Sequence, residues 1–244
     1  MDLLLVEDSP TDCKVIETRL RRAFPDARIS AADDWLQLRE NLKRDDCDVV
    51  VTDYWLGWSD GLSVLQQVKQ RWPRARVILL TGNGGEEVVA EAFKLGLFRY
   101  LLKPDGFGEV VEAVKTAYES RQREDERELM ATIVKLIPDS LQCVDAEGIV
   151  TVSNPSTQRL YGYPENQIVG RSFEMLIPQE KREESRRLHE QALRGQTSPR
   201  LNTIRLHRDG TQVPVVVTLI PIRGEGGKIS RVVHVASPLV ESDP

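Results

Sequence analysis

Carboxylate, hydroxyl and ammonium side chains each follow a short apolar run in the first half of the sequence. They belong to Glu7, Asp8, Asp53, Thr81 and Lys103. Three carboxylates at close quarters raise one another's pKa unless a cation neutralises them. Oxygen ligands of this kind suit Mg²⁺, which keeps several waters and accepts further oxygens from a phosphoryl group. A lysine could pair with the same phosphoryl group, and a threonine could donate a hydrogen bond to it.

Each of these residues has a plainer interpretation when it is taken alone. A strand-end aspartate often caps a helix or a turn, a Lys-Pro pair punctuates a loop, and Thr81 could cap the next helix. Their joint occurrence at the ends of successive apolar runs favours a functional site over coincidence.

The apolar runs before these side chains indicate the elements that must position them. Runs without polar alternation are typical of strands buried on both faces. They cover residues 3–6, 49–51, 77–80 and 100–102, with a fifth strand expected at 27–30. Helical spacing occurs at residues 12–24, 61–72 and 86–95. We therefore predict a (βα)5 doubly wound parallel sheet with helices on both faces, whose carboxyl edge gathers the polar set.

The composition limits the classes to which the chain could belong. Its 244 residues are comfortable for two domains, and 40% hydrophobic with 29% charged residues describe an ordinary globular protein. No apolar run approaches the length that spans a bilayer, and the N-terminus lacks the basic start and long apolar stretch of a signal peptide. We therefore expect a cytoplasmic protein without a membrane partner.

Charge and cysteine content exclude further classes. Residues 1–120 carry 16 Lys+Arg against 21 Asp+Glu, a net −5, whereas residues 121–244 carry 17 of each, a net zero. Neither half has the concentrated basic pattern that neutralises phosphates, so we expect no direct binding of nucleic acid. Cys13, Cys47 and Cys143 are far apart and lack metal-ligand spacing, and we expect them to be reduced.

Residues 1 to about 120 resemble the receiver domain of two-component response regulators, which has a flavodoxin-like fold. The resemblance rests on "LLLVEDSP", "VVVTDYWLGWSDG", "VILLTGNGG" and "YLLKP". It implies that Asp53 accepts a phosphoryl group from the phosphohistidine of a sensor histidine kinase. It also implies that Thr81 and Lys103 contact that group and that Tyr100 is the switch aromatic. Beyond its own phosphoryl transfer and autodephosphorylation, such a domain is not an enzyme.

The same resemblance implies a metal site and leaves one property open. Mg²⁺ would be held by Glu7, Asp8, Asp53 and the backbone carbonyl of Trp55. Gly57 stands where the family usually has proline, and the bulky Trp55 occupies a position that tends to tune dephosphorylation. The lifetime of the phosphorylated state therefore does not follow from the sequence.

A long helix is predicted to connect the two halves, and we assign it to residues 106–137. Glycine and proline are absent from Glu109 to Ile137, and 29 helical residues would extend roughly 43 Å. Apolar residues recur at Val110, Val111, Val114, Ala117 and Tyr118, and again at Leu129, Ile133 and Leu136. The charged middle, "ESRQREDERE", fits a solvated surface, a paired signalling seam or a flexible linker, although the lack of Gly and Pro favours a helix.

The second half has the pattern of an α+β domain with an antiparallel sheet of about five strands. "LQCVDAEGIVTVS" and "NTIRLHRDGTQVPVVVTLIPI" each indicate two strands around a turn, and a last strand is expected at residues 229–236. A charged helix is expected at residues 179–194. Residues 126–238 resemble a PAS domain on "IPDSLQCVDAEGIVTVSNPSTQRLYGYPENQIVGRSFEMLIP" and "RLHRDGTQVPVVVTLIPI".

PAS domains bind haem, flavin or small metabolites, or only dimerise, and individual residues distinguish these uses. Phe173 stands where light-sensing flavin relatives have cysteine, and Ser185 stands where oxygen-sensing haem relatives have histidine. We expect His189 to face solvent, and His207 and His234 to lie on strands without partners. Neither haem nor flavin is therefore expected, and a ligand-free interaction domain is the preferred interpretation.

Together these features predict a phospho-accepting response regulator, with Mg²⁺ as cofactor and a sensor histidine kinase as partner. The signal would pass through the long helix to a PAS domain that forms a homodimer. One alternative is the N-terminal regulatory piece of a hybrid histidine kinase or a diguanylate cyclase. Another is a PAS ligand sensor that controls phosphorylation of the receiver.

Overall fold

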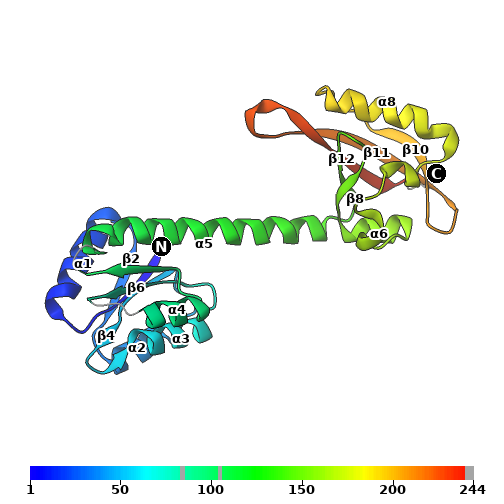
Figure 1. The fold of residues 1–244 in the computed structure, drawn as a ribbon. Helices are drawn as coiled ribbons and strands as arrows, with labels where there is room; N and C mark the ends of the chain where they lie inside the picture. The colour runs from blue at the N-terminus through cyan, green and yellow to red at the C-terminus, as the bar shows by residue number, and fades with distance from the viewer. Residues whose placement is uncertain (83–85, 104–105, 240–244) are drawn as a thin grey trace. The chain divides into compact units, whose positions relative to one another are not determined.

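The computed structural model describes residues 1–82, 86–103 and 106–239 of the chain. The chain separates into two compact units, Met1–Arg127 and Glu128–Pro244. Figure 1 shows a sheet with helices in each unit. In the described residues, no helix combines the length and the hydropathy that are needed to cross a membrane.

A five-stranded parallel sheet forms the centre of the first unit, and it confirms the predicted (βα)5 fold. Its order is β2 (Arg28–Ala32), β1 (Asp2–Val6), β3 (Val49–Asp53), β6 (Arg76–Thr81) and β7 (Arg99–Leu102). The helices are α1 (Pro10–Ala23), α2 (Trp35–Asn41), α3 (Gly61–Arg71), α4 (Glu86–Lys94) and α5 (Gly106–Leu136). Every neighbouring pair of strands is parallel, so all five carboxyl ends lie at one edge.

The strands are apolar throughout because both faces of the sheet are covered. Leu3 and Leu5 pack with α1 and α5 on one face, and Leu4 and Val6 pack with α2, α3 and α4 on the other. All four side chains are fully buried. Figure 1 shows the same two helical layers. Burial of each such side chain contributes about 1.5–3 kcal/mol, and this core fixes where the strand ends lie.

Local signals set where the helices of the first unit begin. The Ser9 side chain accepts a hydrogen bond from the Asp12 N–H and caps α1, in which Pro10 is the first residue. The Asp60 side chain caps α3 in the same way through the Ser63 N–H. At Gly61 an added Cβ would lie 2.7 Å from the Asp53 carbonyl oxygen, so only glycine fits this close approach.

Two features of the first unit were not predicted. A small hairpin of β4 (Trp55–Leu56) and β5 (Ser59–Asp60) follows Asp53 directly. The part of α5 that packs against the first unit also extends past residue 120. Arg121 is buried there and forms ion pairs with Asp46 and Asp48. A charged residue on a helix gives no sequence signal that distinguishes a buried ion pair from a solvated one.

The second unit is an antiparallel sheet with helices on one face, as predicted. Its order is β10 (Leu201–Leu206), β11 (Gln212–Arg223), β12 (Ile229–Pro238), β8 (Ser140–Asp145) and β9 (Val150–Ser153). The α-helices are α6 (Pro155–Tyr161), α7 (Glu165–Ile168) and α8 (Arg182–Leu193). Short 3-10 turns cover Phe173–Leu176, Gln179–Lys181 and Glu225–Gly227. The helix expected at residues 179–194 thus begins as a 3-10 turn and continues as α8.

Candidate functional site

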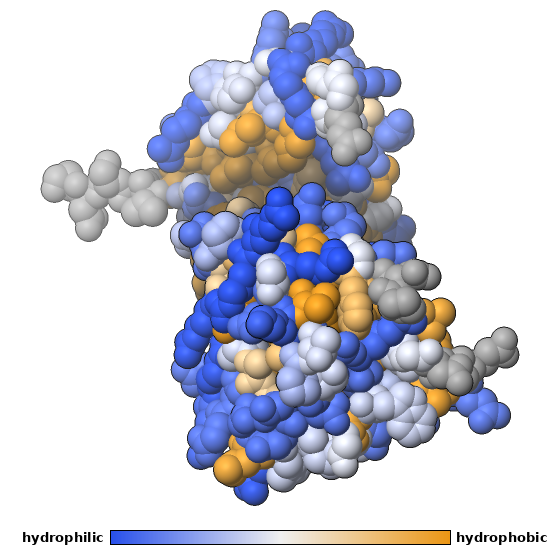
Figure 2. Space-filling view, turned by 90° about the vertical axis from the view of Figure 1, so that its left-hand side faces the viewer, coloured by the Kyte–Doolittle hydropathy of each residue, from blue (hydrophilic) through white to orange (hydrophobic). Residues whose placement is uncertain are grey.

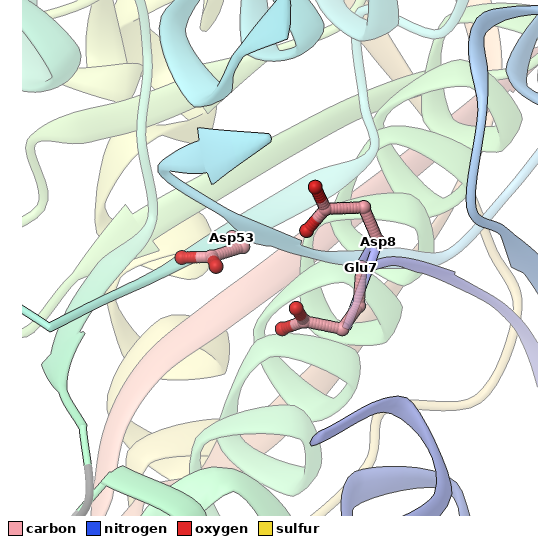
Figure 3. A group of neighbouring side chains, drawn as sticks. All are labelled: Glu7, Asp8 and Asp53. Carbon is pink, nitrogen blue, oxygen red and sulfur yellow. The ribbon is translucent and has the colours of Figure 1, made fainter. Parts of the chain in front are cut away.

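Three carboxylates meet at the carboxyl edge of the parallel sheet. Glu7 and Asp8 follow β1, Asp53 ends β3, and the pairing of Val6 with Thr52 makes these two strand ends neighbours. Each residue offers one carboxylate oxygen, and these oxygens all lie within 4.8 Å of one another. Figure 3 shows the three side chains directed toward a shared space. Glu7 is 1% exposed and Asp53 7%, so little solvent screens their repulsion.

Lys103 joins the carboxylates from the end of β7. Its Nζ lies 2.8 Å from Glu7 Oε2, 2.9 Å from Asp12 Oδ2 and 2.9 Å from Asp53 Oδ2. Burial by itself lowers the pKa of Lys103, but the hydrogen bonds to three carboxylates raise it above its usual range. The lysine is therefore a permanent cation at this edge.

Asp12 belongs to the cluster although sequence reasoning did not select it. It lies in the first turn of α1, and the Ser9 cap orients that turn toward the carboxyl edge of the sheet. The signal that could have identified it is a carboxylate in the first turn of a helix that starts at the site.

The cluster has more negative charge than the lysine neutralises. Burial raises the pKa of Glu7, Lys103 partly offsets this, and the charge of Asp53 raises it further. The Oδ1 atom of Asp53 is buried and has no hydrogen-bond partner among the described residues. A buried carboxylate oxygen without a partner is costly. Its environment fits a divalent cation or a phosphoryl group that would bind there.

The loop after Asp53 holds the Asp8 carboxylate in place. The Gly57 N–H donates a 2.6 Å hydrogen bond to Asp8 Oδ2. Proline at this position could not donate that bond, because it has no N–H. The Trp55 side chain is exposed on β4 and packs edge-on against Tyr54. Its backbone carbonyl, predicted to be a metal ligand, remains a prediction.

Thr81 and Tyr100 lie on adjacent strands beside the cluster. Thr81 ends β6 and is buried, and its carbonyl accepts a 2.7 Å hydrogen bond from the Lys103 N–H. Burial raises the pKa of Tyr100, and the hydrogen-bonding Thr81 side chain partly offsets that effect. The predicted hydroxyl and the predicted switch aromatic are therefore neighbours, and their roles remain predictions.

Most of the histidine predictions for the second unit were wrong, although His234 does lie on a strand, β12. His189 is buried on α8 instead of facing solvent, and its Nδ1 lies 3.1 Å from Nε2 of His234, which therefore has a partner. The side chain of His189 shares its helix face with the buried Ser185 and Ala192, at positions i, i+4 and i+7. That spacing was the available signal. His207 lies outside the strands and contacts Asp209 at 2.9 Å.

Comparison with protein families gives two matches along the chain. Residues 3–115 match the response regulator receiver domain, and residues 128–239 match the PAS fold. Among curated proteins, the response regulator protein PilR of Pseudomonas aeruginosa is 34% identical over 123 residues, which are 50% of this chain and 27% of PilR. The transcriptional regulatory protein ZraR of Klebsiella oxytoca is 29% identical over 107 residues, 44% of this chain and 24% of ZraR.

Solved structures resemble each unit separately. A response regulator receiver domain from Clostridium thermocellum is 27% identical, with a TM-score of 0.45, and covers 50% of this chain and 96% of its own. A PAS domain from Colwellia psychrerythraea is 21% identical, with a TM-score of 0.44, and covers 46% of this chain and 95% of its own. The chain spans about a quarter of the length of the curated relatives named above.

Proposed function

A receiver domain is followed by a PAS domain along this chain, and from this premise we propose that it is a two-component response regulator that is phosphorylated on Asp53. The donor is the phosphohistidine of a partner histidine kinase. The observation that carries the proposal is the buried Asp53 carboxylate, which contacts Lys103 through one oxygen and whose other oxygen has no hydrogen-bond partner in the part of the chain that the structure describes.

Asp53 is the nucleophile of this reaction. One carboxylate oxygen attacks phosphorus, an O–P bond forms as the P–N bond breaks, and the histidine nitrogen of the kinase keeps the electron pair. Lys103 already lies 2.9 Å from Asp53, so its ammonium can turn one N–H toward a phosphoryl oxygen without leaving the site. The Thr81 hydroxyl would donate a second hydrogen bond, and the neighbouring Tyr100 ring would respond to that movement.

Glu7, Asp8 and Asp53 are the residues that would hold Mg²⁺, together with the Trp55 carbonyl. Bound Mg²⁺ supplies positive charge for both the carboxylates and the phosphoryl oxygens. The excess negative charge of the cluster and the unpartnered Asp53 Oδ1 support this assignment. The hydrogen bond from Gly57 keeps Asp8 turned toward the same space.

Phosphorylation can be tested with acetyl phosphate and Mg²⁺, followed by intact-mass analysis. Wild type should gain one phosphoryl group, Asp53→Asn should gain none, and omission of Mg²⁺ should suppress labelling. Asp33→Asn is the matched control, because this exposed aspartate follows β2 at the same edge of the sheet. Equal labelling of Asp53→Asn and wild type would contradict the proposal.

A homodimer through α5 and the PAS domain is the second part of the proposal. Leu129, Met130, Ile133 and Leu136 on α5 are between 44% and 75% exposed, although all four are large and apolar. Leu129, Ile133 and Leu136 share a helix face by their i, i+4, i+7 spacing. A second copy of the chain would cover this stripe on α5 in the manner of a coiled coil. Figure 2 shows another surface, the left-hand side of Figure 1, which is largely hydrophilic with scattered hydrophobic patches.

A further inference from the structure

A small polar cavity lies inside the PAS domain between the sheet and its helices. Its lining includes Gln142 on β8, Arg205 on β10 and His234 on β12, with Tyr161 and Phe173 nearby. The cavity measures about 10 Å³, which is room for one species of about the size of a water molecule. Haem and flavin are far too large for it.

The guanidinium of Arg205 is a buried cation without a carboxylate partner in the described part of the chain. The residue is 7% exposed, and its Nη1 contacts only the neighbouring Ile204 carbonyl, at a long 3.5 Å. Burial lowers the pKa of Arg205, and Tyr161 and Glu184 offset this only in part. Burial also raises the pKa of Tyr161 to about 12, so that this phenol is neutral at physiological pH. An unpaired buried charge is costly unless an opposite charge binds to it.

Gln142 supplies a second unused donor at the same place. The residue is 4% exposed, and its Nε2 has no hydrogen-bond partner among the described residues. Gln142 lies directly opposite His234 across the β8–β12 pair, so both side chains stand on one face of the sheet. Donors from two different strands therefore line the cavity: the Arg205 guanidinium has one long hydrogen bond, and Gln142 Nε2 has none among the described residues.

The histidines at the cavity do not supply the missing negative charge. The Asp145 carbonyl lies 2.9 Å from His189 Nε2 and must accept a hydrogen bond from it. Neutral His189 then accepts at Nδ1 from the Nε2–H of His234, 3.1 Å away. This chain of hydrogen bonds holds both rings in place as neutral groups, and the positive charge of Arg205 remains unbalanced.

We propose that this cavity binds a small monovalent anion of halide size. An anion would accept hydrogen bonds from Arg205 and Gln142 and would neutralise the guanidinium. A single water could accept the same bonds but would leave the charge unpaired. The site would make the stability of the PAS domain depend on the anion, independently of phosphorylation at Asp53.

The test uses the full chain without Mg²⁺ and compares sodium chloride or bromide with sodium gluconate at equal ionic strength. Wild type should broaden the ³⁵Cl NMR line several-fold relative to Arg205→Met. Its PAS unfolding temperature should rise with chloride or bromide and not with gluconate, because a ligand of the folded state stabilises by mass action.

Arg208→Met is the matched control, since this exposed arginine lies three residues further along the chain. It should keep both the broadening of the ³⁵Cl line and the rise in unfolding temperature with halide. Gln142→Leu should weaken them, and it provides a second variant if Arg205→Met fails to fold. Wild type with no halide-dependent line broadening and no halide-dependent stabilisation would overturn the proposal in favour of a bound water. Responses that persist unchanged in folded Arg205→Met or Gln142→Leu would also overturn it.

Discussion

At the scale of single residues, Lys103 organises the receiver site because one ammonium contacts three carboxylates from three different elements. The residue types at the strand ends were enough to predict that Glu7, Asp53 and Lys103 converge. They were not enough to predict Asp12, whose contribution depends on where the cap of α1 turns the chain. That one Asp53 oxygen has no hydrogen-bond partner among residues 1–82, 86–103 and 106–239 is also a property of packing, which no sequence pattern reports.

Lys103→Ala should bind Mg²⁺ but respond weakly to a beryllofluoride mimic of the phosphoryl group. Removing the cation takes away a charge-assisted hydrogen bond to the mimic, which is worth about 1.5–3 kcal/mol, or roughly tenfold or more in affinity. Tryptophan emission can report both steps, because the exposed Trp55 lies two residues after Asp53. The tryptophan emission of the wild-type protein should change first when Mg²⁺ is added and again when the mimic is added.

The control for this experiment is Lys94→Ala, which removes an exposed lysine from the end of α4. It should follow wild type at both steps, and Asp53→Ala should lose the second step. A Lys103→Ala protein that binds the mimic as tightly as wild type would remove Lys103 from the proposed mechanism.

At the scale of elements, α5 has two parts with different surroundings. Val110, Val114 and Ala117 are fully buried in the receiver core, whereas Leu129 and Ile133 are exposed. The periodicity of the sequence predicted a long helix and located both apolar stripes. It could not show which stripe is buried within the chain, because a stripe that packs internally and one that pairs with another copy have the same spacing.

Ile133→Glu should weaken the proposed homodimer, since a charge would enter an apolar seam. We expect the dissociation constant, measured by sedimentation equilibrium, to rise at least about tenfold, which corresponds to about 1.4 kcal/mol. Ala131→Glu adds the same charge at an exposed position on the opposite face of α5 and should leave the dimer intact. A wild-type chain that sediments as a monomer at high concentration would end the dimer hypothesis.

The contact between α8 and the sheet should make the stability of the PAS domain depend on pH. Burial holds the pKa of His234 well below its ordinary value, and the neighbouring His189 and the charge of Arg205 add to the effect. In the unfolded chain this imidazole titrates near 6.5. The unfolded state therefore binds a proton that the folded state does not bind, and stability is lost as the pH falls below about 6.5.

The expected slope is at most about 1.4 kcal/mol of unfolding free energy per pH unit for His234. Urea unfolding between pH 7.5 and 5.5 in halide-free buffer would measure it. His234→Leu should reduce this slope without abolishing it, because burial also lowers the pKa of His189. His207→Gln, in the turn between β10 and β11, is the matched control. A slope that is the same in wild type and His234→Leu would show that another group is responsible.

At the scale of the whole molecule, the sequence was sufficient for the two folds and for their order along the chain. Apolar runs without alternation predicted the parallel sheet, and turn signals such as Asp209-Gly210 predicted the hairpins of the antiparallel one. The sequence was insufficient inside the PAS domain, where His189, Arg205 and Gln142 are polar residues at buried positions. Polar residues at such positions are usually interpreted as surface, so the cavity that they line gave no signal.

The central claim is that Asp53 of this chain is the residue that carries the phosphoryl group. The most direct measurement is reduction of the acetyl phosphate-treated protein with sodium borohydride, which converts a phosphorylated aspartate into homoserine and leaves free carboxylates unchanged. Peptide mass spectrometry should then locate homoserine at residue 53, only when Mg²⁺ was present during phosphorylation. Homoserine at another position, such as Asp8 or Asp12, with an intact aspartate at position 53 would contradict the claim.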